Sequence, residues 1–280
     1  MRIGTTMGGY DRFGEQKYLK IRAHGFSAVD FNLSNTDSPF YTLTLQEALL
    51  ILEKEKQLAQ EAGIEIWQAH GPWRWPPQDA TAAQRQERME KMQRSIVMTA
   101  ALGCKNWVVH PIMPFGEEDR DTDDAPRTWE LNYTFFSQLL KAAKAHDIVI
   151  CFENMPAPKL SLSTPSDILQ FVRTINDDHF KICLDTGHAA IAADEPVEDC
   201  IRKLGANIQV LHVHDCYGGM DLHLLPYQGI INWPGVGAAL KEIGFNGVFS
   251  LETGAPQRLP DPLFEEMTIS IANIAKEIIK

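Results

Sequence analysis

The sequence predicts a single α/β domain, residues 1–280, folded as an eight-stranded (β/α)8 barrel. One pattern recurs along the chain: an amphipathic segment, a glycine-containing turn, and then a short apolar run. The apolar runs are nearly continuous, as at residues 148–152, which is typical of parallel strands covered on both faces. No linker-like change in composition divides the chain, and barrels of this kind need about 250 residues.

Eight strands and eight helices follow from this pattern in strict alternation. The glycine of each turn supplies the left-handed residue that ends a helix, as Gly63 does before the run EIWQAH. Strict alternation favours a closed parallel barrel over an open sheet. We expect strands near residues 2–6, 27–33, 64–70, 106–110, 148–153, 180–185, 208–214 and 247–252. We expect helices near residues 13–24, 44–62, 80–102, 128–146, 165–176, 196–204, 233–243 and 263–279.

The composition is that of a globular protein with a sizeable core, since 44% of the residues are hydrophobic and 22% are charged. The apolar runs have strand length, so we expect no membrane span. The segment MRIGTTMGGY lacks the basic and apolar regions of a signal peptide, and the five cysteines form no CxxC pair. We therefore expect a cytoplasmic protein with reduced thiols. A formal net charge of -11 disfavours nucleic acid as a partner.

The third to the eighth expected strands each close with a residue that can bind a metal ion. In a parallel barrel these strand ends converge on one rim, where such enzymes carry their active sites. Carboxylates and imidazoles crowded together there would repel or desolvate one another without a cation. The sequence therefore predicts at least one divalent metal site among His70, His110, Glu153, Asp185, His212 and Glu252.

Four further residues are expected at the same rim. His188 ends the segment LDTGH, and Asp221 and His223 lie in the loop after the seventh strand. His214 follows His212 by two residues, so both side chains point to the same face of the strand. We expect His214 to lie behind the ligands, and its replacement of His212 as the ligand is kept as an alternative.

Several segments together resemble the xylose isomerase-like TIM barrel superfamily: CFENMP, CLDTGH, HVHD, DLH and ALKEIGFNGVFSLET. That superfamily contains sugar isomerases, sugar 3-epimerases and endonuclease IV. The resemblance to the epimerases implies one metal ion held by Glu153, Asp185, His212 and Glu252. The additional zinc ligands of endonuclease IV match His70, His110, His188, Asp221 and His223, which implies up to three ions.

Departures from both branches affect the expected substrate. Residues 117–124 contain six acids and one arginine, and the loop NLSNTDSPFY has no lysine or arginine, so the rim opposes a DNA backbone. Gly218 and Gly219 occupy the region where sugar 3-epimerases carry an arginine, which argues against a standard ketohexose specificity.

Aromatic residues at the rim favour a small substrate with a partly apolar face. Trp73 and Trp75 follow the third strand, and sugar C–H faces stack on such rings. We expect both tryptophans to contact the substrate, together with His188 and His214.

The leading hypothesis is a metal-dependent isomerase or epimerase acting on a sugar, a sugar phosphate or a polyol-derived ketone. Glu153 and Glu252 would move a proton beside the carbonyl through an enediolate, while Mn²⁺, Mg²⁺ or Zn²⁺ holds the substrate oxygens. The alternative is a zinc-dependent hydrolase of abasic DNA that resembles endonuclease IV. A third alternative is a metal-bound sugar sensor without activity. A homo-oligomer is compatible with the sequence.

Overall fold

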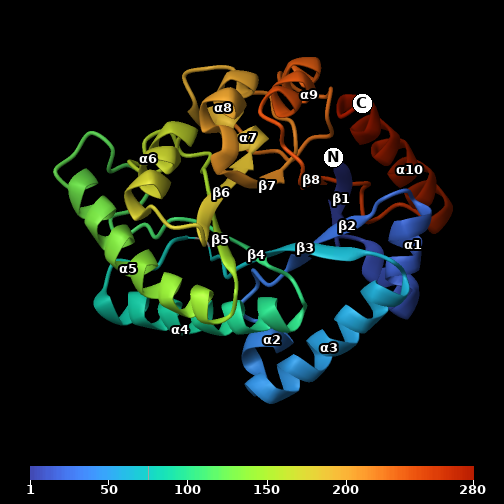
Figure 1. Ribbon diagram of the computed structural model, residues 1–280, viewed down its shortest axis with the longest axis horizontal. Helices are drawn as coiled ribbons and strands as arrows, with labels where there is room; N and C mark the ends of the chain where they lie inside the picture. The colour runs from blue at the N-terminus through green and yellow to red at the C-terminus, as the bar shows by residue number, and fades with distance from the viewer. Residues whose placement is uncertain (75) are drawn as a thin grey trace.

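The computed structural model describes residues 1–74 and 76–280, so Trp75 lies outside the described residues. Eight parallel strands surround a central axis, and helices cover the outside (Figure 1). This arrangement confirms the predicted (β/α)8 barrel. The strands are β1 (Arg2–Thr6), β2 (Ala28–Asn32), β3 (Glu65–His70), β4 (Asn106–Val109), β5 (Val149–Glu153), β6 (Phe180–Asp185), β7 (Ile208–His212) and β8 (Val248–Leu251).

The sheet closes between its two end strands. Hydrogen-bonded neighbours run in the order β7-β6-β5-β4-β3-β2-β1-β8. A parallel bridge between Val213 and Leu251 joins the ends, and the amide of Glu252 donates to the carbonyl of Val213 at 3.0 Å. The residues that follow β7 and β8 are thereby held next to each other at one rim of the barrel.

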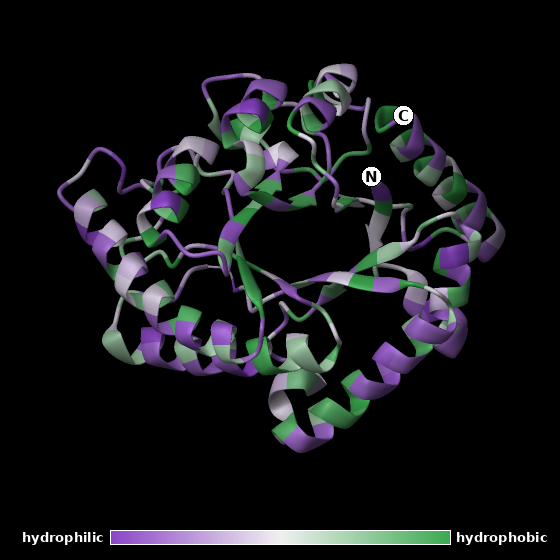
Figure 2. Cartoon of the chain, in the orientation of Figure 1, coloured by the Kyte–Doolittle hydropathy of each residue, from purple (hydrophilic) through white to green (hydrophobic). Residues whose placement is uncertain are grey.

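The helices cover the barrel with their apolar sides turned inward (Figure 2). Reciprocal capping boxes begin three of them, at Thr44, Thr81 and Thr164, and supply partners for otherwise free backbone N–H groups. None of the helices in the described ranges is long and apolar enough to cross a membrane. The helices are η1 (Tyr10–Gln16), α1 (Lys17–Ala23), α2 (Pro39–Thr42), α3 (Leu45–Glu61), α4 (Ala82–Ala101), α5 (Ala125–Ala145), α6 (Pro165–Ile175), α7 (Thr186–Ala192), α8 (Val197–Leu204), η2 (Gly205–Asn207), α9 (Trp233–Glu242) and α10 (Asp261–Ile278).

The observed boundaries differ from the expected ones in two respects. Strands β2, β4, β7 and β8 end one or two residues earlier than expected, so that Glu252 is the first residue after β8 rather than its last. The short helices α2 and α7 and the turn η2 were not predicted. Helix α7 matters most, because it begins directly at the end of β6 and carries His188.

The charge of the acidic loop before α5 suggests a solvated segment, but two of its residues are held by specific contacts. Asp119 is only 2% exposed and accepts hydrogen bonds from the Ser161 amide at 2.7 Å, the Ser161 hydroxyl at 2.9 Å and the Thr128 hydroxyl. Arg120 donates to the carbonyls of Pro158 and Leu160 and pairs with Asp167. These contacts tie the loop after β4 to the loop after β5.

Replacing Asp119 should destabilise the barrel because it strips three buried donors of their acceptor. We expect D119A to lower the free energy of unfolding by about 2–3 kcal/mol, since hydrogen bonds to charged groups contribute about 1.5–3 kcal/mol. The matched control is E118A, because Glu118 is exposed and among the described residues its side chain pairs with the equally exposed Lys159. Its effect should stay within about 0.5 kcal/mol. Denaturant unfolding measures both, and equal effects would contradict the role of Asp119.

Candidate metal centre

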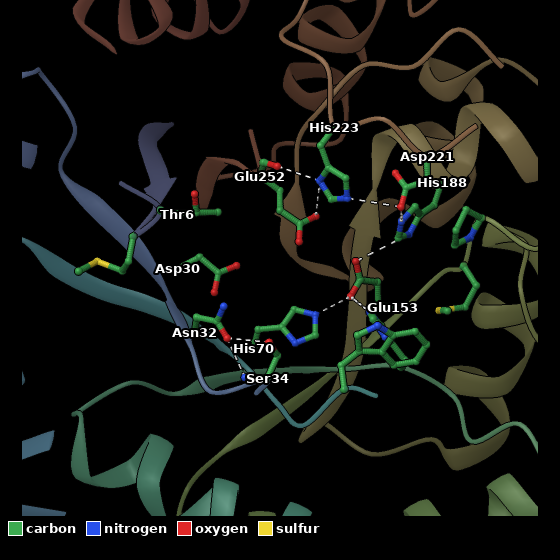
Figure 3. Close-up of a pocket in the computed structure, with 16 residues that line it drawn as sticks. Thr6, Asp30, Asn32, Ser34, His70, Glu153, His188, Asp221, His223 and Glu252 are labelled. Atoms are coloured by element: carbon green, nitrogen blue, oxygen red, sulfur yellow. Dashed lines mark hydrogen bonds and ion pairs between the residues drawn. The ribbon is translucent and has the colours of Figure 1, made fainter. Parts of the chain in front are cut away.

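A cavity of about 410 Å³ opens at the C-terminal ends of the strands (Figure 3). Ionisable side chains from several strand ends and from the loops after them surround it. The cavity is lined by Thr6, Met7, Gly8, Asp30, Asn32, Ser34, His70, Trp73, His110, Glu153, Met155, Pro156, His188, Asp221, His223 and Glu252.

The core of the site is a group of four residues from the last four strands. Glu153, Asp185 and His212 end β5, β6 and β7, and Glu252 follows β8. Each offers a ligand atom, and these atoms all lie within 4.8 Å of one another. Nδ1 of His212 lies 2.7 Å from Oε1 of Glu153 and 3.3 Å from Oε2 of Glu252. The structure therefore brings together the four residues predicted to bind the first metal ion.

The two glutamates of this group have opposite electrostatic environments. Burial alone would raise the pKa of the Glu153 carboxyl, but His212 and His110 hold it well below its usual range. Burial is the main cause that raises the pKa of Glu252 to about 7; His212 opposes this shift, and the charges of Glu153 and Asp185 add to it. Without a cation, one of these carboxyl groups is firmly ionised and the other binds a proton readily.

Unpartnered oxygens test whether a cation fits this group. Oε2 of Glu153 lies 2.8 Å from Nε2 of His110 but makes no well-aligned hydrogen bond within the described part of the chain. Oε2 of Glu252 is likewise buried and has no hydrogen-bond partner among the described residues. A buried carboxylate oxygen without a partner is costly. Three carboxylates and one imidazole are suitable ligands for a divalent ion, so the donor set fits one.

His70 and His110 lie on the β3 and β4 side of Glu153. Nε2 of His70 is 3.7 Å from Oε2 of Glu153 (Figure 3). His70, Glu153 and His212 also form a group whose ligand atoms lie within 4.8 Å of one another. Burial lowers the pKa of His110 to about 4, which keeps its imidazole neutral and able to coordinate.

His188 reaches the site from the first turn of α7. The carboxylate of Asp185 caps this helix by accepting from the His188 amide at 2.6 Å. Nδ1 of His188 bonds to the Asn154 carbonyl at 2.8 Å, which leaves Nε2 facing Oδ2 of Asp221 at 3.2 Å. Burial would lower the pKa of His188, but Asp185 and Asp221 raise it to about 10. A position that holds a protonated imidazole between carboxylates also suits a cation.

His214 belongs to this outer part of the site rather than to the core group. Its Nε2 lies 3.0 Å from Oδ2 of Asp185, and its ring stacks on His223 with centroids 4.1 Å apart. His188, His214, Asp221 and His223 form a third group with ligand atoms within 4.8 Å of one another. His212 at the end of β7 and His214 two residues beyond it thus belong to different groups.

Of the two tryptophans expected to contact the substrate, Trp73 is described by the structure and lies at the cavity. Trp73 lines the cavity and meets the His110 ring edge to face, with centroids 4.3 Å apart. The prediction for Trp75 falls outside the described residues. Met155, which the sequence analysis did not consider, packs with Trp73, and Met7 lines the cavity from the end of β1.

Strand β2 contributes residues that the sequence analysis missed. Asp30 and Asn32 alternate along the strand and both face the cavity, and Ser34 follows them (Figure 3). The period-two pattern of polar residues in AVDFNLS was the available signal. Asp30 is 5% exposed and contacts His212, the metal-site residue on the opposite side of the barrel.

Residues 19–273 match the family model described as xylose isomerase-like TIM barrel. The chain belongs to this family. An uncharacterised protein of Methanocaldococcus jannaschii is 31% identical over 249 residues, covering 83% of this chain and 76% of the relative. D-psicose 3-epimerase of Enterocloster bolteae is 26% identical over 247 residues, covering 85% of this chain and 76% of the enzyme.

Solved structures of the xylose isomerase-like family superpose along the whole chain. A D-tagatose 3-epimerase-like protein has a TM-score of 0.77 at 26% identity and covers 100% of this chain and 98% of its own. The IOLI protein, solved with a zinc atom, has a TM-score of 0.76 at 18% identity, covering 100% of this chain and 98% of its own. The second likeness concerns the fold alone.

Gly187 permits the close approach of α7 to the end of β7 in this xylose isomerase-like barrel. A Cβ atom at this position would overlap the imidazole ring of His214. We expect G187A to displace His214 and to lower the free energy of unfolding by about 1–3 kcal/mol, the usual cost of overpacking. Gly254 is the matched control, because a Cβ there meets nothing within 4 Å among the described residues. Thermal and denaturant unfolding of G187A and G254A decide the point, and equal stability of the two variants would refute it.

Proposed function

We propose that this protein is a divalent-metal-dependent isomerase or epimerase acting on an uncharged sugar or polyol-derived ketone. One observation carries the proposal. Two members of the four-residue core group, Glu153 and Glu252, also line the cavity, so a substrate bound there would contact both. The E. bolteae relative is a D-psicose 3-epimerase, which supports chemistry at a sugar carbon beside a carbonyl.

Glu153, Asp185, His212 and Glu252 would hold the first ion. Three carboxylates and one imidazole suit Mn²⁺ or Mg²⁺, whereas the histidine-rich outer group suits Zn²⁺. When bound, the ion would polarise a carbonyl oxygen of the substrate and stabilise negative charge on it. In an isomerase the outer residues would contact substrate oxygens, whereas in an endonuclease-like hydrolase they would bind further ions.

The two glutamates would move the proton. Glu153 and Glu252 come from β5 and β8, so their carboxylates approach a substrate from different sides. One takes a proton from the carbon beside the carbonyl and the other returns it, which gives epimerisation. Return of the proton to the neighbouring carbon gives isomerisation. Trp73, Met7 and Met155 would pack on the apolar face of the substrate and exclude water.

The charge of the cavity favours an uncharged substrate over a phosphorylated one. None of the described residues that line the cavity is lysine or arginine, whereas Asp30, Glu153, Asp221 and Glu252 are acidic. Apart from the proposed ion and the protonated His188, the described lining offers a phosphate group no cationic guanidinium or ammonium partner.

Endonuclease-like hydrolysis is the second candidate, because the residues that match the nine zinc ligands of endonuclease IV line or adjoin this rim. The acidic cavity weighs against it, since phosphodiester recognition requires cations along the backbone path. Metal stoichiometry separates the candidates, because three tightly bound zinc ions would favour the hydrolase.

Metal removal should lower thermal stability. An ion present at about 100 times its dissociation constant contributes about 2.7 kcal/mol, or roughly 5–10 °C in melting temperature for a chain of this size. We expect chelator-treated protein to melt lower by that amount and Mn²⁺ or Zn²⁺ to restore it. D185N should lose most of the metal-dependent shift, and E118Q, at an exposed site, should keep it. Calorimetry with elemental analysis tests this, and a wild-type protein that binds no divalent ion would contradict the proposed function.

Replacing either glutamate tests the proton transfer. E153Q and E252Q keep an oxygen donor but cannot act as bases, so the rate should stay about 10²–10⁴-fold lower at saturating metal. Proton transfer also requires deuterium from solvent to enter the product, seen by NMR with uncharged ketoses and cyclic polyol ketones. Their phosphate esters should be poorer substrates. Full recovery of rate with excess metal, or retention of the original hydrogen, would leave the glutamates as ligands only.

A further inference from the structure

Asp30 contacts the Nε2 atom of His212, whereas the proposed metal ligands Glu153 and Glu252 lie at its Nδ1 atom. Oδ2 of Asp30 lies 2.7 Å from Nε2 of His212, and both side chains are buried. Asp30 belongs to β2, and His212 ends β7, 182 residues further along the chain. The contact therefore depends on the closed barrel and crosses its interior.

The contact keeps a proton on Nε2 of His212, so that Nδ1 is the ring nitrogen left to give up its proton to an ion. An ionised carboxylate only accepts hydrogen bonds, so Nε2 of His212 must donate to Asp30. The other nitrogen, Nδ1, faces Oε1 of Glu153 at 2.7 Å and Oε2 of Glu252 at 3.3 Å. The imidazole thus turns its Nδ1 toward the core group and its Nε2 away from it.

Gln68 holds Asp30 in this orientation. Its amide nitrogen donates to Oδ2 of Asp30 at 3.0 Å and to the carbonyl of Leu211 at 3.2 Å. Both amide hydrogens are used, and a flipped amide would bring an oxygen against the carboxylate. Leu211 directly precedes His212, so Gln68 also fixes the backbone from which the imidazole extends.

We propose that Asp30 is a positioning residue for the metal site, which keeps His212 protonated at Nε2 and presents Nδ1 to the ion. The inference rests on the proposed metal-dependent function. Ligating histidines commonly donate their second N–H to a carboxylate, which fixes the tautomer and makes the ligand more basic. Asp30 supplies this partner from the floor of the cavity, while its Oδ1 has no hydrogen-bond partner among the described residues.

A binding experiment on metal-free protein tests the role of Asp30. D30N replaces the carboxylate with an amide that can flip and donate, so the tautomer is no longer enforced. We expect Mn²⁺ or Zn²⁺ to bind about 10–100-fold more weakly, the usual loss when such a partner is removed. The matched control is N32A, because Asn32 lies two residues along the same strand, faces the same cavity and bonds only to Ser34 in the described structure. Its metal affinity should stay close to that of the wild type.

Nitrogen NMR of the wild-type protein loaded with Zn²⁺ gives a readout independent of any variant. We expect the His212 ring to show a metal-bound Nδ1 and a protonated Nε2 whose hydrogen is protected from solvent. Coordination through Nε2 would overturn the proposal even if D30N failed to fold. So would equal metal affinity of D30N and N32A. Failure of the proposed function is distinguishable, since the wild-type protein itself would then bind no ion.

Discussion

The site is organised around one buried carboxylate. Glu153 is 1% exposed, and imidazole nitrogens of four histidines lie near its two oxygens: His212 at 2.7 Å, His110 at 2.8 Å, His70 at 3.7 Å and His188 at 3.9 Å. A charge buried to this degree persists only if positive charge or hydrogen bonds compensate it. His212 and His188, whose pKa values the surrounding carboxylates raise, supply positive charge, and a divalent ion bound there would take over this compensation.

Asp185 of the core group caps α7, but other acids hold the long loops around the site. Asp215 is fully buried and accepts from Trp233 Nε1 at 2.8 Å and from the amides of Gly229 and Ile231, which folds the long loop after β7 back on itself. Asp119 performs the same task for the loop after β4. These loops are therefore anchored by acids of their own, and Glu153 and Glu252 are not needed to hold them.

Local patterns in the sequence were sufficient to predict the strands but not to predict every residue of the site. Continuous apolar runs determined the strands to within two residues, and the residues at their ends led directly to the predicted ligands. Helix α7 was not predicted because its sequence, TGHAAIA, is short and its N-cap residue, Asp185, had already been assigned to the end of a strand. The role of Asp30 was not predicted because its partner, His212, lies 182 residues further along the chain. The alternation of Asp30 and Asn32 along their strand indicates that both face the barrel interior, but no local pattern identifies His212 as the partner of Asp30.

The choice between sugar and nucleic acid chemistry depends on groups outside the ligand set. Both branches of the family can be built on the same histidines and carboxylates, so the ligands alone do not discriminate. Near the rim, the guanidinium of Arg120 is engaged by two backbone carbonyls and Asp167, and that of Arg74 by the Gln78 carbonyl and Glu87. A phosphate entering the cavity would have to compete with these partners while facing the acidic lining. An uncharged substrate avoids that cost and still presents the hydroxyl and carbonyl oxygens that a metal ion binds.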